Sequence, residues 1–456
     1  MIDGDQGETR PTGSAPAVEV IGGGLAGCEA AWRIAGHGLR VRLWEMKPHK
    51  FSPAHRMEGL AELVCSNSFR ADRPENAVGL LKEEMRRLGS LVMTAADRTR
   101  VPAGGALAVD REMFSREMTR AIEAQPLIEL VRAEITAWPE GPAPVVVAGG
   151  PLASEALASL LRELLEAPNL HFYDALAPIV TRDSLDFSRI YSANRYQEGE
   201  GDYLNCPLSR EEFDTFLAAL LEADQVVPRA FEDQRYFEGC LPIEIMARRG
   251  PRTLTFGPMK PVGLDDPATG RRPYAVVQLR RENAGGALWN MVGFQTRLTR
   301  PAQDKVFRLI PGLEKAEFAR YGAIHRNTYL DAPKVLDEFQ RLKNASRFFV
   351  AGQISGVEGY VESAAQGLWA GENAARTVLG RPLISPPPST ALGALLGHLQ
   401  NDGGRKYFAP SNINFGLFAS PPPEVPKSQR SAWLLAAARR DFEFLGESLI
   451  IEEANE

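Results

Sequence analysis

The chain has little cysteine, no long apolar run and no excess of positive charge. Its 456 residues include four cysteines, none in CxxC spacing, which argues against a disulfide scaffold and against a zinc or other metal site. No run of about eighteen apolar residues occurs, which argues against a membrane-spanning helix. Residues 1–16 lack the apolar core of a signal peptide. We therefore expect a cytoplasmic protein with no membrane partner.

The composition, at 44% hydrophobic and 24% charged residues, is that of a globular enzyme with two or three domains. The formal net charge of −6 argues weakly against a nucleic-acid partner, because phosphate binding needs a positive field. A local concentration of basic residues can overrule that total.

The N-terminal pattern is a strand, a glycine turn, a helix, a second strand and an acid. Residues 17–21 have the pattern of a short apolar strand, and Gly22, Gly24 and Gly27 come directly after it. An alanine-rich helix then extends to about residue 35, and a second strand, residues 39–44, ends at Glu45. In this dinucleotide fingerprint the glycines serve the tight turn, the approach of a pyrophosphate and the packing of helix on strand. A carboxylate at Glu45 suits the ribose of FAD or NAD and would repel a 2′-phosphate. The alternative is a glycine-rich turn without a ligand.

A second unit of this kind near the C-terminus favours FAD over NAD. Residues 347–351 form an apolar strand, and residues 362–377 have helical composition. The turn between them supplies candidate cofactor contacts at Gly352, Gln353, Gly356, Gly359 and Tyr360. A third apolar strand, residues 145–148, ends in three turn residues and fits another edge of the same sheet. The alternative is that the late glycines only terminate turns and helices.

Between these halves the composition changes. Residues 246–300 hold ten Lys and Arg against three Asp and Glu, interleaved with Phe256, Tyr274, Trp289 and Phe294. Guanidinium groups with aromatic neighbours suit RNA, although such a run is commonly a solvated face. The predicted class is α/β: a Rossmann-type FAD-binding domain assembled from both chain ends (17–193 and 321–456, the latter with a C-terminal tail), a smaller inserted α+β RNA or substrate domain (194–320) and a disordered leader (1–16).

Several longer segments carry a resemblance to a known family. They are residues 20–27, 61–68, 76–85, 102–111, 203–207, 237–244, 325–328, 352–360 and 412–416. In these segments the chain resembles the folate- and FAD-dependent tRNA uracil-5-methyltransferases, the TrmFO family. The segments around Cys65 and Cys240 are much more specific than a cofactor fingerprint. The leader departs from the family pattern.

The resemblance implies methylation of the T-loop uridine of tRNA at C5, with methylenetetrahydrofolate as the one-carbon donor and FAD reduced by NADH or NADPH. Uracil C5 is a poor nucleophile until a thiolate adds to C6. By motif position Cys240 is the nucleophile and Cys65 its partner, with the division of roles open. His325 resembles the family histidine that stacks on folate, and Arg248, Arg249 and Arg252 are candidates for tRNA binding. A capped turn is the alternative for His325.

The remaining cysteines, Cys28 and Cys206, are expected to be structural. Glu244 is a candidate acid or uracil ligand, with a surface carboxylate as the simpler interpretation. Two other functions stay open: a wobble-uridine modifying flavoenzyme like MnmG (GidA), which would need a partner GTPase, and a flavin oxidoreductase that uses NADH or NADPH without an RNA role. The methyltransferase needs no obligate protein partner.

Overall fold

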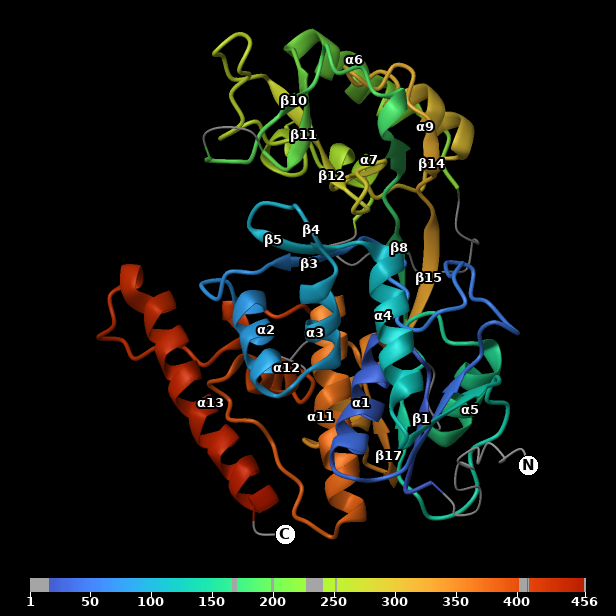
Figure 1. Cartoon of the computed structure of the whole chain (residues 1–456). Helices are drawn as coiled ribbons and strands as arrows, with labels where there is room; N and C mark the ends of the chain where they lie inside the picture. The colour runs from blue at the N-terminus through green and yellow to red at the C-terminus, as the bar shows by residue number, and fades with distance from the viewer. Residues whose placement is uncertain are drawn as a thin grey trace, which may run out of the picture.

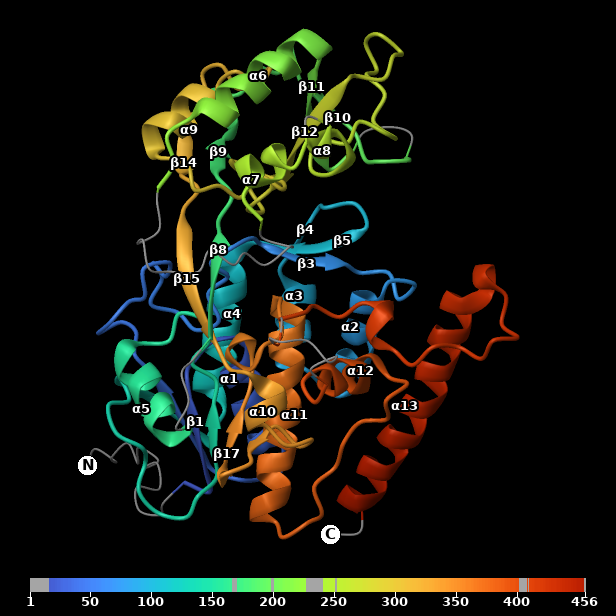
Figure 2. The same ribbon diagram turned by 180° about the vertical axis from the view of Figure 1, so that it is seen from behind.

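The computed structural model describes residues 16–165, 170–197, 201–226, 241–250, 252–401, 408 and 410–454, so the predicted leader lies almost wholly outside the described residues. Two bodies, each with its own sheet and hydrophobic core, lie one above the other in Figures 1 and 2. We call the lower body the glycine-loop domain and the upper body the inserted domain.

The glycine-loop domain is built on a six-stranded sheet with the order β16-β17-β7-β1-β2-β6. Its parallel strands are β1 (Val18–Ile21), β2 (Val41–Glu45), β6 (Ile128–Arg132), β7 (Val145–Val147) and β17 (Ala345–Val350), and β16 (Arg341–Leu342) pairs antiparallel with β17. The α/β prediction is confirmed, and both chain ends contribute to one sheet. The strand expected at another edge, β7, instead lies inside the sheet between β1 and β17.

Two helices that are far apart in the sequence pack against each other in this domain (Figure 1). They are α1 (Leu25–Gly36) and α11 (Tyr360–Val378). Two glycines of α11 allow the close approach: a Cβ at Gly367 would lie 2.0 Å from the Ala26 carbonyl oxygen, and one at Gly371 would lie 2.7 Å from that of Ala30. This contact fixes the two helix N-termini relative to each other.

Further helices complete the glycine-loop domain. They are α2 (Ala77–Arg87), α3 (Leu91–Arg98), α4 (Arg111–Ala124), α5 (Glu155–Leu165), α10 (Ala332–Val335), α12 (Ala391–His398) and α13 (Arg430–Ala454). A small sheet of β3 (Ser68–Ala71), β5 (Ala106–Val109) and β4 (Arg100–Val101) faces the inserted domain. Its turn touches that domain, because the Gly104 backbone N–H donates to Asp202 at 2.6 Å.

The inserted domain is built on an antiparallel sheet with the order β10-β11-β12-β13-β9-β14. The strands are β9 (Ile179–Thr181), β10 (Tyr191–Ser192), β11 (Tyr203–Leu208), β12 (Ala275–Arg281), β13 (Leu288–Met291) and β14 (Phe318–Arg320), and the helices are α6 (Arg210–Glu222), α7 (Ile243–Arg248), α8 (Thr253–Phe256) and α9 (Arg300–Phe307). Because β9 and β10 pair within this sheet, the predicted domain start at residue 194 is too late.

Two strands connect the bodies. The chain enters the inserted domain through β8 (Leu170–Ala175) and returns through β15 (Ile324–Tyr329), and the two strands pair antiparallel. Figures 1 and 2 show this ribbon between the two bodies.

Candidate functional site

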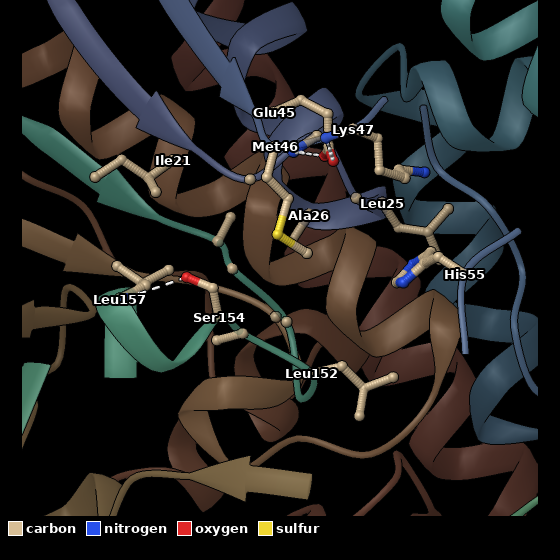
Figure 3. A pocket seen from close by; sticks show the side chains of 18 of the residues that line it. Ile21, Leu25, Ala26, Glu45, Met46, Lys47, His55, Leu152, Ser154 and Leu157 are labelled. Atoms are coloured by element: carbon tan, nitrogen blue, oxygen red, sulfur yellow. Dashed lines mark hydrogen bonds between the residues drawn. The ribbon is translucent and has the colours of Figure 1, made fainter. Parts of the chain in front are cut away.

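A pocket lies where the parallel strands of the glycine-loop domain end. Its lining comes from both ends of the chain, with residues 21–26, 44–47 and 148–154 on one part and Gly352, Gln353 and Tyr360 on another. Figure 3 shows Glu45, Met46 and Lys47 on one side of this cavity, and Ser154 and Leu157 on the other. The carboxyl ends of parallel strands are where α/β folds place their ligands.

The first glycine loop has the geometry that a phosphate cradle requires. Gly22 has φ +106°, which favours glycine, and a Cβ there would lie 2.4 Å from the Ala148 carbonyl oxygen. A Cβ at Gly27 would lie 1.7 Å from the Gly22 carbonyl oxygen, whereas one at Gly24 would meet no atom within 4 Å. No side chain caps α1 at Gly24. The helix N-terminus therefore presents N–H groups and its positive dipole end to the pocket.

Glu45 lies buried at the end of β2 and orders this loop. Its two carboxylate oxygens accept hydrogen bonds from the backbone N–H groups of Gly23, at 2.8 Å, and Lys47, at 2.9 Å. Each oxygen keeps a further lone pair for a ligand hydroxyl. The carboxylate is thus fixed at the pocket wall, at the place where a dinucleotide ribose is expected.

The C-terminal glycine unit presents a second helix N-terminus. Gly352 has φ +84°, and its N–H donates to the Gln366 side chain at 2.9 Å. Gly359, with φ +113°, precedes the first residue of α11, Tyr360, and no side chain caps this helix. Of the predicted contacts in this unit, Gly352, Gln353 and Tyr360 line the pocket, while Gly356 packs against Phe408.

Cys65 lies beside this second helix N-terminus, although it is 295 positions from Tyr360 in the sequence. The backbone N–H groups of Cys65 and Ser66 donate to the Tyr360 hydroxyl at 2.7 and 3.2 Å. The thiol is free and half-buried, and the preceding residue, Val64, lines the pocket. Burial, and then the nearby Cys65, raises the pKa of Tyr360. The structure therefore places one predicted catalytic cysteine next to two residues that line the pocket, Val64 and Tyr360.

Two arginines surround the Cys65 segment. Arg111 and Arg320 are both largely buried, and Glu282 contacts Arg111 with 2.7 Å between its carboxylate and the Arg111 Nε. Burial, and then repulsion from Arg111, lowers the pKa of Arg320 to about 10. Both guanidinium groups are thus charged at neutral pH.

Cys240 lies outside the described residues. His325 is in β15 opposite Asp174 of β8, a strand and not a capped turn, but its side chain is not among those described. Cys28 and Cys206 are fully buried, and burial raises the pKa of both thiols. This placement fits the structural role expected for them.

Glu244 is not the surface carboxylate of the simpler interpretation. It is fully buried, and its oxygens accept hydrogen bonds from the Thr296 hydroxyl and the Arg297 backbone N–H, both at 2.9 Å. Burial outweighs these bonds and raises its pKa. The carboxylate joins α7 to the loop after β13, which explains why an acid follows an apolar turn at this position.

The basic region divides into exposed and structural residues. Arg248, Arg249 and Arg252, which we call the arginine triplet, are exposed at α7 and before α8. Phe256, the last residue of α8, is 76% exposed. By contrast, Arg280 is buried, and Trp289 and Phe294 belong to the core of the inserted domain. Only part of the sequence pattern is therefore an exposed face.

Sequence reasoning missed several pocket residues. Met46, His55 and Glu134 line the cavity, as Figure 3 shows for the first two. Met46 and Glu134 follow the ends of β2 and β6, so they could have been found once those strands were placed. His55 lies in a segment without regular structure, held by a 2.5 Å hydrogen bond to Ser52, and no sequence pattern signals it. In the described part of the chain, no helix is long and apolar enough to cross a membrane.

Comparisons with known proteins show the family and the fold of this chain. The family model described as Glucose inhibited division protein A matches residues 17–382. Two solved structures of Aquifex aeolicus GidA have TM-scores of 0.68 and 0.65 at 18% identity, and cover 94% and 93% of this chain and 73% and 76% of theirs. The chain is thus a member of the GidA class of proteins by its family model, and its fold is that of GidA.

Closer relatives are similar over almost their whole length. The protein named methylenetetrahydrofolate–tRNA-(uracil-5-)-methyltransferase TrmFO of Geobacter sulfurreducens is 59% identical, covering 92% of this chain and 97% of the relative. Those of Geotalea uraniireducens and Desulfotalea psychrophila are 57% and 52% identical, covering 92% and 96% of this chain and 96% and 98% of the relatives. The chain belongs to the TrmFO family.

Proposed function

We propose that the protein methylates the T-loop uridine of tRNA at C5, with methylenetetrahydrofolate as the one-carbon donor and FAD reduced by NADH or NADPH. The observation that carries this proposal is 59% identity, over 92% of the chain, to a relative named for the folate-dependent tRNA reaction. The pocket assembled from both chain ends supports it.

The residues at the pocket fit FAD. A cradle open above Gly24, two helix N-termini without side-chain caps and the buried Glu45 match a diphosphate and a ribose. Gly22, Gly24 and Gly27 would form the phosphate turn, and the unit from Gly352 to Tyr360 would hold the other end of the cofactor. When bound and reduced, FAD would supply the two electrons needed to reduce the one-carbon unit from the methylene to the methyl level.

The cysteines act on the uracil ring. Cys240 adds to C6 as a thiolate and makes C5 an enolate carbon, which forms the new bond to the one-carbon unit. Cys65 then removes the C5 proton, and the bond between the one-carbon unit and the nitrogen of its carrier breaks. Two electrons and a proton, which the reduced cofactor would supply, convert the unit to a methyl group as the Cys240 thiolate leaves C6 and the ring is restored. The supporting observation for Cys65 is its place between the pocket and the inserted domain, with its backbone held by the Tyr360 hydroxyl.

The inserted domain binds tRNA and the return strand binds folate in this proposal. The exposed arginine triplet and Phe256 suit phosphates and an unpaired base. His325 would stack on folate from β15, the strand that returns toward the cofactor pocket.

One assay tests the proposal. Purified protein is incubated with unmodified tRNA, methylenetetrahydrofolate labelled in its transferred carbon, and NADH or NADPH, and the nucleosides are then separated. We expect labelled 5-methyluridine, and none when folate or reductant is omitted. A labelled product at the wobble uridine would support the MnmG-like function instead. Oxidation of NADH or NADPH with no modified nucleoside would support an oxidoreductase without an RNA role.

A further inference from the structure

The segment before and after Cys65 has no regular secondary structure, yet five of its backbone groups form hydrogen bonds with side chains from elsewhere in the chain. The carbonyl oxygens of Val64 and Cys65 accept hydrogen bonds from the two terminal nitrogens of Arg320, at 3.1 and 3.0 Å. Arg111 donates to the Leu63 carbonyl oxygen. Buried backbone groups outside helices and sheets need such partners. Here side chains supply them, and among the described residues no hydrogen bond joins the Cys65 thiol to this network.

Arg320 comes from the other body of the molecule. It is the last residue of β14, at the edge of the sheet in the inserted domain, and lies 255 positions from Cys65 in the sequence. Its planar guanidinium can hold two neighbouring carbonyl groups at once, which a single ammonium cannot do with the same geometry. The position of the Cys65 backbone therefore depends on the position of the inserted sheet.

Asn67 makes a second connection to that sheet. Its side chain is fully buried, and its amide nitrogen donates to the carbonyl oxygens of Val109, at 2.8 Å, and Arg281, at 3.0 Å. Its amide oxygen accepts from the Arg280 Nε at 3.1 Å. Arg280 can only donate, so this contact fixes the orientation of the amide. Asn67 thus links the small sheet of one domain to β12 of the other, two residues beyond Cys65.

We propose that Arg320 and Asn67 are positioning residues that hold Cys65 in register with the inserted domain, so that a substrate bound there meets the thiol at the cofactor pocket. This inference rests on the proposed function for its substrate, but the contacts that carry it do not. Neither residue touches reacting atoms. Their role is to keep the thiol in place when the inserted domain carries the target nucleotide.

The test compares Arg320→Met with Arg320→Lys and with a control, Arg308→Met. Arg308 also donates from its side chain to a backbone carbonyl, that of Ala316, but within the inserted domain. For Arg320→Met we expect kcat to fall about 10²-fold, as for a misplaced reacting group, with the KM for tRNA and the flavin content within twofold of wild type. Arg320→Lys should recover part of kcat, and Arg308→Met should match wild type.

A second readout needs no methylation. The rate at which iodoacetamide alkylates Cys65, followed by peptide mass spectrometry, should rise severalfold in Arg320→Met and less in Arg320→Lys. If Arg320→Met does not fold, the Arg320→Lys measurement decides alone. If Arg320→Lys has the kcat and the alkylation rate of wild type, the proposal is overturned. It is also overturned if Arg320→Met loses kcat, flavin content and thermal stability to the same extent and Arg320→Lys recovers none of them. If wild-type protein does not methylate tRNA, the proposed function fails, and the alkylation rates still decide the positioning role.

Discussion

Replacing Gly24 with leucine tests the cofactor pocket, because the new side chain should obstruct a ligand in the pocket without disturbing helix α1. Gly24 has φ −77°, which leucine adopts without strain, and a Cβ there meets no atom within 4 Å. The side chain would enter the pocket that Gly24 lines. If it displaces one charge-assisted hydrogen bond to a phosphate, the loss is about 1.5–3 kcal/mol. That corresponds to a rise of about 10- to 150-fold in the Kd for FAD.

Gly36 provides the matched control. It ends the same helix, a Cβ there also meets no atom within 4 Å, and it does not line the pocket. The ratio of flavin to protein absorbance and titration of the stripped protein with FAD should show weak binding for Gly24→Leu and wild-type binding for Gly36→Leu. The reasoning is refuted if Gly24→Leu binds FAD as tightly as wild type, or if both variants lose FAD to the same extent.

Four further results are expected. Reversing the charge of the arginine triplet should weaken tRNA binding and flatten its salt dependence without loss of flavin, because phosphate contacts set that slope; an unchanged slope would make the triplet a solvated face. Phe256→Ala should raise the KM for tRNA about tenfold, the loss of one stacked base, whereas Phe187→Ala, 43% exposed in the same domain, should not. With tRNA that carries 5-fluorouridine, the wild-type protein should form a covalent adduct that Cys240→Ala loses and Cys65→Ala keeps; the opposite pattern would reverse the two roles. Burial would raise the pKa of Glu372, but hydrogen bonds and charges from His37 and Arg33 outweigh it and lower the pKa to about 2. In urea unfolding, Glu372→Gln should therefore be about 3 kcal/mol less stable than wild type above pH 4.5, and the two stabilities should converge as the pH falls toward 2.

The glycine-loop domain could be predicted because its signals are local. β1, β2 and β17 are short, mainly apolar runs that end at or near a glycine or an acid, and the reason for Gly27 is local, because its neighbour is the Gly22 carbonyl oxygen. The close packing of α1 on α11 could not be predicted, because Gly367 is explained only by a carbonyl group at residue 26. A helical glycine by itself has no such meaning.

The inserted domain shows the opposite case. β9 and β10 have three and two residues, too short for an alternating pattern, so the predicted start of the inserted domain at residue 194 is too late. Its basic run also combined two populations, since Arg280 binds a buried asparagine while the arginine triplet faces solvent. Charge in a sequence window does not reveal which side of a strand a residue occupies.

In the proposed function, the division of the molecule into two bodies requires the Cys65 segment to be held from both sides. Electrons are expected at the pocket of the glycine-loop domain, and the nucleotide on the inserted domain, so a thiol that serves the reaction has to be fixed relative to both. Tyr360 provides the first reference, because it begins a helix that lines the pocket. Arg320 provides the second, because it ends a strand of the other sheet. A cysteine held by only one domain would follow that domain in any relative motion, and a displacement of about 1 Å is enough to slow a reaction substantially.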